Sequence, residues 1–167
     1  AANLGVVELT LSILKHFHPE KHPIIWDVGH QSYPYKVLTG RRGALKTIRQ
    51  QNGISGFPKR SENSLDYFGT GHSSTSLSAI MGIAAGHQLS GNENRHIAII
   101  GDGALSGGMS MEALNNLVDL PINCLIIFND NGMGIDPNGG AIDRQSDEKI
   151  AELFSFFGLT YTGPIDG

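Results

Sequence analysis

The chain has 167 residues, a length that fits one domain able to bury about 70% of the surface its unfolded form exposes. It carries 12 Lys and Arg against 16 Asp and Glu, a formal charge of -4, so nucleic acid and anionic membrane surfaces are poor partners. No apolar run approaches the roughly 20 residues of a membrane span, and we expect a soluble protein of the cytoplasm, or of a plastid stroma in a eukaryote.

Strand and helix patterns alternate along the chain. Three apolar runs rich in Ile and Val lack two-residue alternation, which is typical of parallel strands buried on both faces. In chain order, we expect a helix over residues 4–14 capped by Asn3, a strand over 24–28, short helices near 34–38 and 45–49, a helix over 74–89, a strand over 96–100, a helix over 109–118, a strand over 122–128 and a helix over 147–157. This order predicts an α/β fold, a mostly parallel sheet with helices on both faces.

Three further features complete the pattern. The segment from 29 to 70 has few periodic runs, and a loop of that length in a compact domain is typically functional. The helix over 74–89 is rich in Ala and Gly, which allow close approach, so we expect it to be buried against the sheet or at a subunit interface. Cys124 lies in an apolar run and is expected to be a small buried residue without chemistry.

Polar groups follow the second and third predicted strands. Gly101-Asp102-Gly103 ends one strand and Asn129-Asp130-Asn131 ends the next, a spacing of one βαβ unit. The carboxyl ends of adjacent parallel strands meet at one edge, where open α/β sheets bind ligands. The carboxylate of Asp102 and the amide oxygen of Asn131 suit Mg²⁺. The alternative is a capped turn and an ordinary Asn-rich hairpin, but together the two groups favour a metal that carries a phosphate.

The glycines around Asp102 favour the same ligand. Gly101 and Gly103 remove side chains where a diphosphate must come close, and the amides of Gly103 and Ala104 can donate hydrogen bonds to it. A dinucleotide-binding fingerprint is excluded because Ser106 stands where its third glycine is required, and no P-loop pattern occurs.

The spacing from Gly-Asp-Gly to Asn is similar to the signature of thiamine-diphosphate enzymes. Four further stretches, at residues 26–31, 38–42, 71–76 and 163–167, resemble the 1-deoxy-D-xylulose-5-phosphate synthase family, and the likeness covers nearly the whole chain. The stretch Gly-His-Ser-Ser-Thr-Ser at 71–76 separates this family from ordinary transketolases. The resemblance implies a transferase that condenses pyruvate with D-glyceraldehyde 3-phosphate to 1-deoxy-D-xylulose 5-phosphate and CO₂, the first step of the non-mevalonate route to isoprenoid precursors.

The resemblance also assigns site residues. It implies that Mg²⁺ is bound by Asp102, Asn131 and the backbone carbonyl of Met133. The diphosphate would be held by Gly103, Ala104 and Asn131, and the cofactor would be faced by His30, Gly71, His72 and Ser73.

Two histidines are candidates for proton transfer. His30 and His72 each follow a glycine at the end of an apolar or small-residue stretch, where an imidazole can meet phosphate or a reacting oxygen. The remaining histidines, at 16, 18, 22, 87 and 96, are expected to be solvated or satisfied. Arg41 and Arg42 fit a substrate anion and a solvated role equally well.

The same resemblance implies that residues 1–167 are the diphosphate-binding domain of a longer, homodimeric enzyme. Its activating glutamate and a histidine of a Gly-Gly-His stretch would lie outside the chain, so we expect these residues alone to bind cofactor weakly and to turn over nothing. The joint near 143–147 is shorter than in the family and predicts a missing segment. The alternatives are a transketolase-like or 2-oxo acid dehydrogenase component, and a non-catalytic binding module.

Overall fold

The structure is a computed structural model that describes residues 3–130, 139–142 and 145–165. Its elements follow in the order η1 Leu4–Val6, α1 Val7–His16, β1 Ile24–Trp26, α2 Tyr33–Lys36, η2 Val37–Arg41, η3 Gly43–Thr47, α3 Ser76–Leu89, β2 His96–Gly101, α4 Asp102–Leu105, α5 Gly108–Leu117, β3 Cys124–Asn129 and α6 Asp147–Phe156. The predicted strands and helices are confirmed within a few residues at their ends, whereas the short α4 and most of η2 were not expected. The predicted joint near 143–147 falls partly on residues 143 and 144, outside the described ranges.

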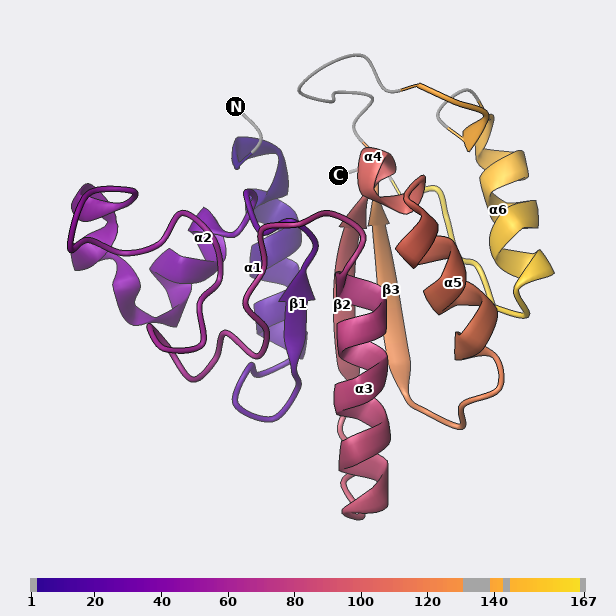
Figure 1. Cartoon of the computed structure of the whole chain (residues 1–167), viewed down its shortest axis with the longest axis horizontal. Helices are drawn as coiled ribbons and strands as arrows, with labels where there is room; N and C mark the ends of the chain where they lie inside the picture. Colours follow the sequence, from indigo (N-terminus) through magenta and orange to yellow (C-terminus); the bar gives the residue numbers. More distant parts are fainter. Residues whose placement is uncertain (1–2, 131–138, 143–144, 166–167) are drawn as a thin grey trace.

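The three strands form one parallel sheet with β2 at its centre. The register pairs Ile24 of β1 with Ile97 of β2, and it pairs Gly101 at the end of β2 with Asn129 at the end of β3. The strands therefore finish at the same edge, where α4 begins (Figure 1). The predicted parallel arrangement is confirmed.

Helices cover both faces of the sheet, as predicted. Successive side chains of a strand point to opposite faces. Ile25, Ala98 and Ile100 enter one apolar cluster with residues of α3, α5 and α6. The neighbouring side chains, those of Ile24, Trp26, Ile97 and Ile99, enter a second cluster with residues of α1 and α2. Figure 1 shows these two layers on opposite sides of the strands.

The expectation that all three strands are buried on both faces is wrong for β3. Leu125 leaves 37% of its surface exposed, whereas every residue of β1 is buried. On the face covered by α1, only Ile127 of β3 packs against the apolar cluster, so this strand is an edge with one face partly open. Cys124 at its start is a free thiol, and burial raises its pKa to about 12, which agrees with a residue without chemistry.

A buried network of charges folds the long segment between β1 and α3. Lys36 is fully buried and its Nζ lies 2.5 Å from Oε1 of Glu62. Arg41 donates two hydrogen bonds to Asp66, at 2.6 and 2.9 Å, and one to Glu62 at 2.9 Å. The two carboxylates also accept from backbone amides, those of Ser55 and Lys59. Ion pairs and hydrogen bonds between charged groups therefore organise this segment, which lacks periodic apolar residues.

The network gives Arg41 neither of the two roles left open for it, a partner of a substrate anion or a solvated residue. Its guanidinium is buried against Asp66 and Glu62, so it stabilises the fold and does not face a substrate. Arg42 is exposed. Burial favours the neutral form of Glu62, but hydrogen bonds from Lys36, the Ser55 amide and Arg41 outweigh it and hold the pKa of Glu62 below its usual range.

Within the described residues, no helix combines the length and the apolar character needed to span a bilayer.

Removal of Asp66 tests the network. We expect Asp66→Ala to lower the free energy of unfolding by about 3–5 kcal/mol, because it leaves the guanidinium of Arg41 buried without its bidentate partner. Urea denaturation followed by circular dichroism measures the change. The control is Lys149→Ala, which breaks an exposed ion pair with Glu152 and should leave stability unchanged. Equal effects of the two variants would contradict the buried network.

Candidate functional site

Three segments meet at the carboxyl edge of the sheet. The first follows β1, the second is the turn that leads into α3, and the third runs from the end of β2 through α4 (Figure 1). Asp27 accepts hydrogen bonds from the amides of Ser74 and Ser76, at 2.7 and 2.9 Å. The hydroxyl of Ser74 donates to the carbonyl of Ala104 at 2.7 Å. These contacts join the segments that carry His30, the turn at 71–73 and Asp102.

Asp102 has the properties expected of a cation ligand. It is the first residue of α4, and its Oδ1 accepts from the amide of Gly103 at 2.7 Å. Its Oδ2 is buried and has no hydrogen-bond partner among the described residues. A buried carboxylate oxygen without a donor is costly, and a cation removes that cost. The other proposed metal ligands, Asn131 and Met133, lie outside the described residues.

The carboxylate of Asp102 is a hard oxygen ligand, the type that Mg²⁺ prefers. No group of three or more His, Cys, Asp or Glu side chains suited to a metal occurs in the described ranges. Mg²⁺ needs few protein ligands, because water and phosphate oxygens fill most of its octahedron. One carboxylate with a free oxygen is therefore sufficient as the start of such a site.

The proposed phosphate donors are held in different ways. Gly103 is exposed, but its amide already donates to Asp102, so a phosphate would have to share or replace that bond. Ala104 is buried, and its carbonyl accepts from the hydroxyls of Ser74 and Ser110. The α4 turn is therefore fixed from two sides.

His30 lies in a tightly held loop after β1. Gly29 has a φ of +88°, and a Cβ there would overlap the hydroxyl of Thr70, so the position requires glycine. Asn3 donates to the carbonyl of His30 at 2.9 Å and accepts from the amide of Tyr33 at 3.0 Å. The expectation that Asn3 caps the first helix is wrong, because its side chain makes no capping bond and instead fastens this loop.

The imidazole of His30 is affected by burial and by two nearby charges. It is half-buried, and its Nδ1 has no hydrogen-bond partner among the described residues. Burial lowers its pKa below 6.5, and the positive charge of Arg49 lowers it further, while the negative charge of Asp27 opposes both effects. The ring is therefore neutral at neutral pH, and its Nδ1 is buried without a partner among the described residues.

His72 stands on the exposed turn before α3, together with Gly71 and Ser73. Its Nδ1 lies 2.7 Å from the carbonyl oxygen of Ser73. A carbonyl only accepts, so Nδ1 carries a proton in this contact, and Nε2 is the ring nitrogen without a bond inside the turn. The turn thus offers one oriented nitrogen to a ligand at this edge.

Two residues that join this edge were not predicted. Asp27 and Ser74 make the contacts between the segments, yet the sequence marks them only as members of stretches similar to a family. The sequence did contain a signal for Asp27, because this acid comes directly after a buried strand. The same signal identifies Asp102.

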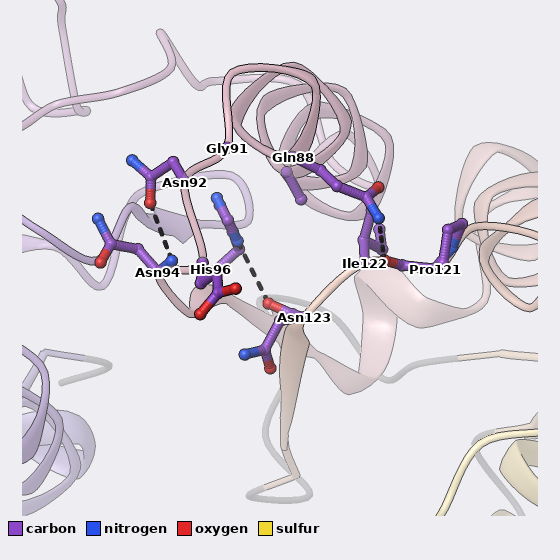
Figure 2. A pocket seen from close by; sticks show the side chains of 10 residues that line it. Gln88, Gly91, Asn92, Asn94, His96, Pro121, Ile122 and Asn123 are labelled. Atoms are coloured by element: carbon purple, nitrogen blue, oxygen red, sulfur yellow. Dashed lines mark hydrogen bonds between the residues drawn. The ribbon is translucent and has the colours of Figure 1, made fainter.

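A polar pocket lies at the opposite edge, beside the start of β2 (Figure 2). His96 is only 2% exposed there, and its two nitrogens contact the carbonyl of Asn123 and Nδ1 of His87. Burial is the main cause that lowers its pKa. Gln88 donates to the carbonyl of Pro121 across the pocket. None of the predicted site residues lines this pocket, and its histidine is satisfied.

Comparison with known proteins identifies the family that the chain resembles. A family model described as 1-deoxy-D-xylulose-5-phosphate synthase matches residues 1–150. Proteins named 1-deoxy-D-xylulose-5-phosphate synthase from Bordetella petrii and Methylobacillus flagellatus are 44% and 42% identical over all of the chain, which covers 33% and 34% of their lengths. One from Clostridium botulinum is 56% identical over 86% of the chain and 23% of its own length. The chain thus spans about a third or less of these relatives.

Titration of His30 tests the electrostatics of the site. We expect its imidazole to titrate below 6.5 in an NMR experiment. Arg49→Gln should raise the midpoint, since it removes a positive charge that disfavours protonation. The control is Arg42→Gln, which removes an exposed charge that does not act on His30 and should leave the midpoint unchanged. A midpoint at or above 6.5 in the unaltered protein would contradict the assignment.

Proposed function

The chain belongs to the 1-deoxy-D-xylulose-5-phosphate synthase family, and we propose that it forms the part of such an enzyme that binds magnesium and the diphosphate of thiamine diphosphate. The reaction proposed for the whole protein is the condensation of pyruvate with D-glyceraldehyde 3-phosphate to 1-deoxy-D-xylulose 5-phosphate and CO₂. The chain covers about a third of two of its relatives, so the activity belongs to the longer protein.

The carboxylate of Asp102 is the observation that carries the proposal. Its Oδ2 is buried without a partner among the described residues, at the end of the central strand. A cation at that oxygen would compensate the buried charge and draw a diphosphate toward the exposed Gly103 and the turn at 71–73. Asn131 and the carbonyl of Met133 are proposed as the further metal ligands, and Ala104 and Asn131 as further diphosphate contacts.

We propose that two histidines transfer protons and stabilise developing charge. Thiamine diphosphate, when bound, would supply the electron sink for loss of CO₂ from a 2-oxo acid. His30 offers a neutral, half-buried ring in the loop after β1, and His72 offers Nε2 from the opposite segment of the edge. Each can donate or accept a proton at a substrate oxygen, or stabilise an alkoxide that develops there.

Loss of the Asp102 charge tests the anchor. We expect Asp102→Asn in the full-length protein to weaken binding of thiamine diphosphate with Mg²⁺ by more than about 10-fold, measured by isothermal titration calorimetry. Asp119→Asn is the matched control, because Asp119 is an exposed acid beyond the far end of α5. A double variant Asp102→Ala, Asn131→Ala that binds as tightly as the unaltered protein would overturn the anchor.

The product that forms distinguishes the proposed reaction from that of a transketolase. The full-length protein, supplied with pyruvate and D-glyceraldehyde 3-phosphate, should form 1-deoxy-D-xylulose 5-phosphate and release CO₂. Sedoheptulose 7-phosphate formed from pentose phosphates would instead identify a transketolase activity. Residues 1–167 alone are expected to form neither product.

The proposal includes a cytoplasmic homodimer. The outer face of α3 supports the dimer, since Gly82 and Gly86 are exposed there and an added Cβ at either meets nothing within 4 Å. Sedimentation of the full-length protein should give twice the mass of one chain, and a single-chain mass would contradict it.

A further inference from the structure

Asp27 makes an unusual pair of contacts for a buried acid. It is 7% exposed, and its two carboxylate oxygens accept from two backbone amides of another segment. Oδ1 accepts from Ser74 at 2.7 Å and Oδ2 from Ser76 at 2.9 Å. Its own amide donates to the carbonyl of Ile99 in β2 at 2.7 Å. One side chain therefore fixes the start of α3 to the end of β1, and its backbone fixes both to the central strand.

Ser74 continues this linkage to the turn that carries Asp102. It has a φ of +68°, a conformation that L residues rarely adopt, and it is buried. That conformation directs its amide to Asp27 while its hydroxyl reaches the carbonyl of Ala104 at 2.7 Å. Gly107 leaves the space for the hydroxyl, because a Cβ at that position would overlap it.

We propose that Asp27 is a positioning residue for the diphosphate end of the site. It holds the turn of Gly71, His72 and Ser73 against the α4 turn of Asp102 and Gly103, and Ser74 is the connecting residue. The inference rests on the proposed function for what the edge binds, but the linkage itself is a property of the protein without ligand.

The physical reason lies in the charge of Asp27. Hydrogen bonds from amides to a carboxylate are shorter and stronger than those to a neutral acceptor. An isolated buried carboxylate is costly, so both amides must stay in place to compensate it. The turn that carries His72 is thus already ordered before a ligand binds. Less conformational entropy is therefore lost when a diphosphate binds between the two segments.

Hydrogen exchange of the amides measures the linkage without any ligand. Asp27→Asn replaces one carboxylate oxygen by an NH₂ group that faces an N–H donor. We expect amide exchange over residues 71–76 to accelerate by at least about 10-fold, the loss associated with one hydrogen bond to a charged group. Amides that exchange by local opening far from Asp27, such as those near the ends of α6, should keep their exchange rates, because that opening does not break the contacts of Asp27. Equal acceleration there would mean a general loosening of the fold and would overturn the proposal.

A second pair of variants keeps the test independent of how Asp27→Asn folds. Ser74→Ala keeps the amide bond to Asp27 and removes the hydroxyl that reaches Ala104. Ser110→Ala removes the other hydroxyl on the same carbonyl, but Ser110 lies on α5 and its hydroxyl bonds to Ala104, not to residues 71–76. Only Ser74→Ala should accelerate exchange over 71–76. The same exchange pattern in both variants would overturn the role of Ser74 as the link.

The cofactor measurements separate this inference from the proposed function. In the full-length protein, Asp27→Asn and Ser74→Ala should weaken binding of thiamine diphosphate with Mg²⁺ by about 10-fold, with Ser110→Ala unchanged within about twofold. Failure of the unaltered protein to bind the cofactor would overturn the proposed function alone, because the exchange result still decides the linkage. Normal binding by Asp27→Asn together with accelerated exchange would show a linkage that does not position the site, and would overturn the inference.

Discussion

Parallel pairing of β2 with both neighbours is the constraint on which the rest of the structure depends. Because all three strands run in one direction, the chain leaves each of them at the same edge and must return outside the sheet. The residues that follow the strands are therefore brought together although they are far apart in sequence. Asp27, Asp102 and Asn129 each come at or directly after a strand end, and this position explains why the polar groups of the edge gather there.

The edge needs rigid support because its loops are long. The segment between β1 and α3 holds no strand among its described residues, and it begins with the loop of His30. Its fold depends on Lys36, Arg41, Glu62 and Asp66, whose charges are buried and mutually compensated. Buried charges are costly when unpaired, so this segment has few alternative arrangements once the four meet. It can therefore hold the loop of His30 in place without an apolar core of its own.

Local sequence patterns predicted the helices and strands, but they did not predict which distant residues contact one another. The strands and helices follow from the spacing of apolar residues within each run, so the parallel α/β architecture was predictable. The exposure of β3 was not, because it depends on how far α1 reaches across the sheet. The partners of Asn3 and Arg41 lie about 20–30 residues away, and neither periodicity nor propensity specifies such contacts. Asp102 was predicted as a ligand because a local motif surrounds it. Asp27 also follows a strand, but its role depends on contacts with distant residues, so it was not predicted.

The glycines of the edge show why composition alone does not identify a ligand site. Gly101 makes only an ordinary contact with the carbonyl of Asn129, and Gly107 leaves room for the hydroxyl of Ser74. Gly29 admits Thr70 in the same way. These glycines allow protein segments to approach one another. Contacts within the protein therefore account for them, and their number is no evidence that a phosphate binds. The buried, unpartnered oxygen of Asp102 differs in kind, because no contact among the described residues repays its desolvation. The case for a cation, and through it for a diphosphate, therefore rests on that oxygen and not on the glycine-rich sequence around it.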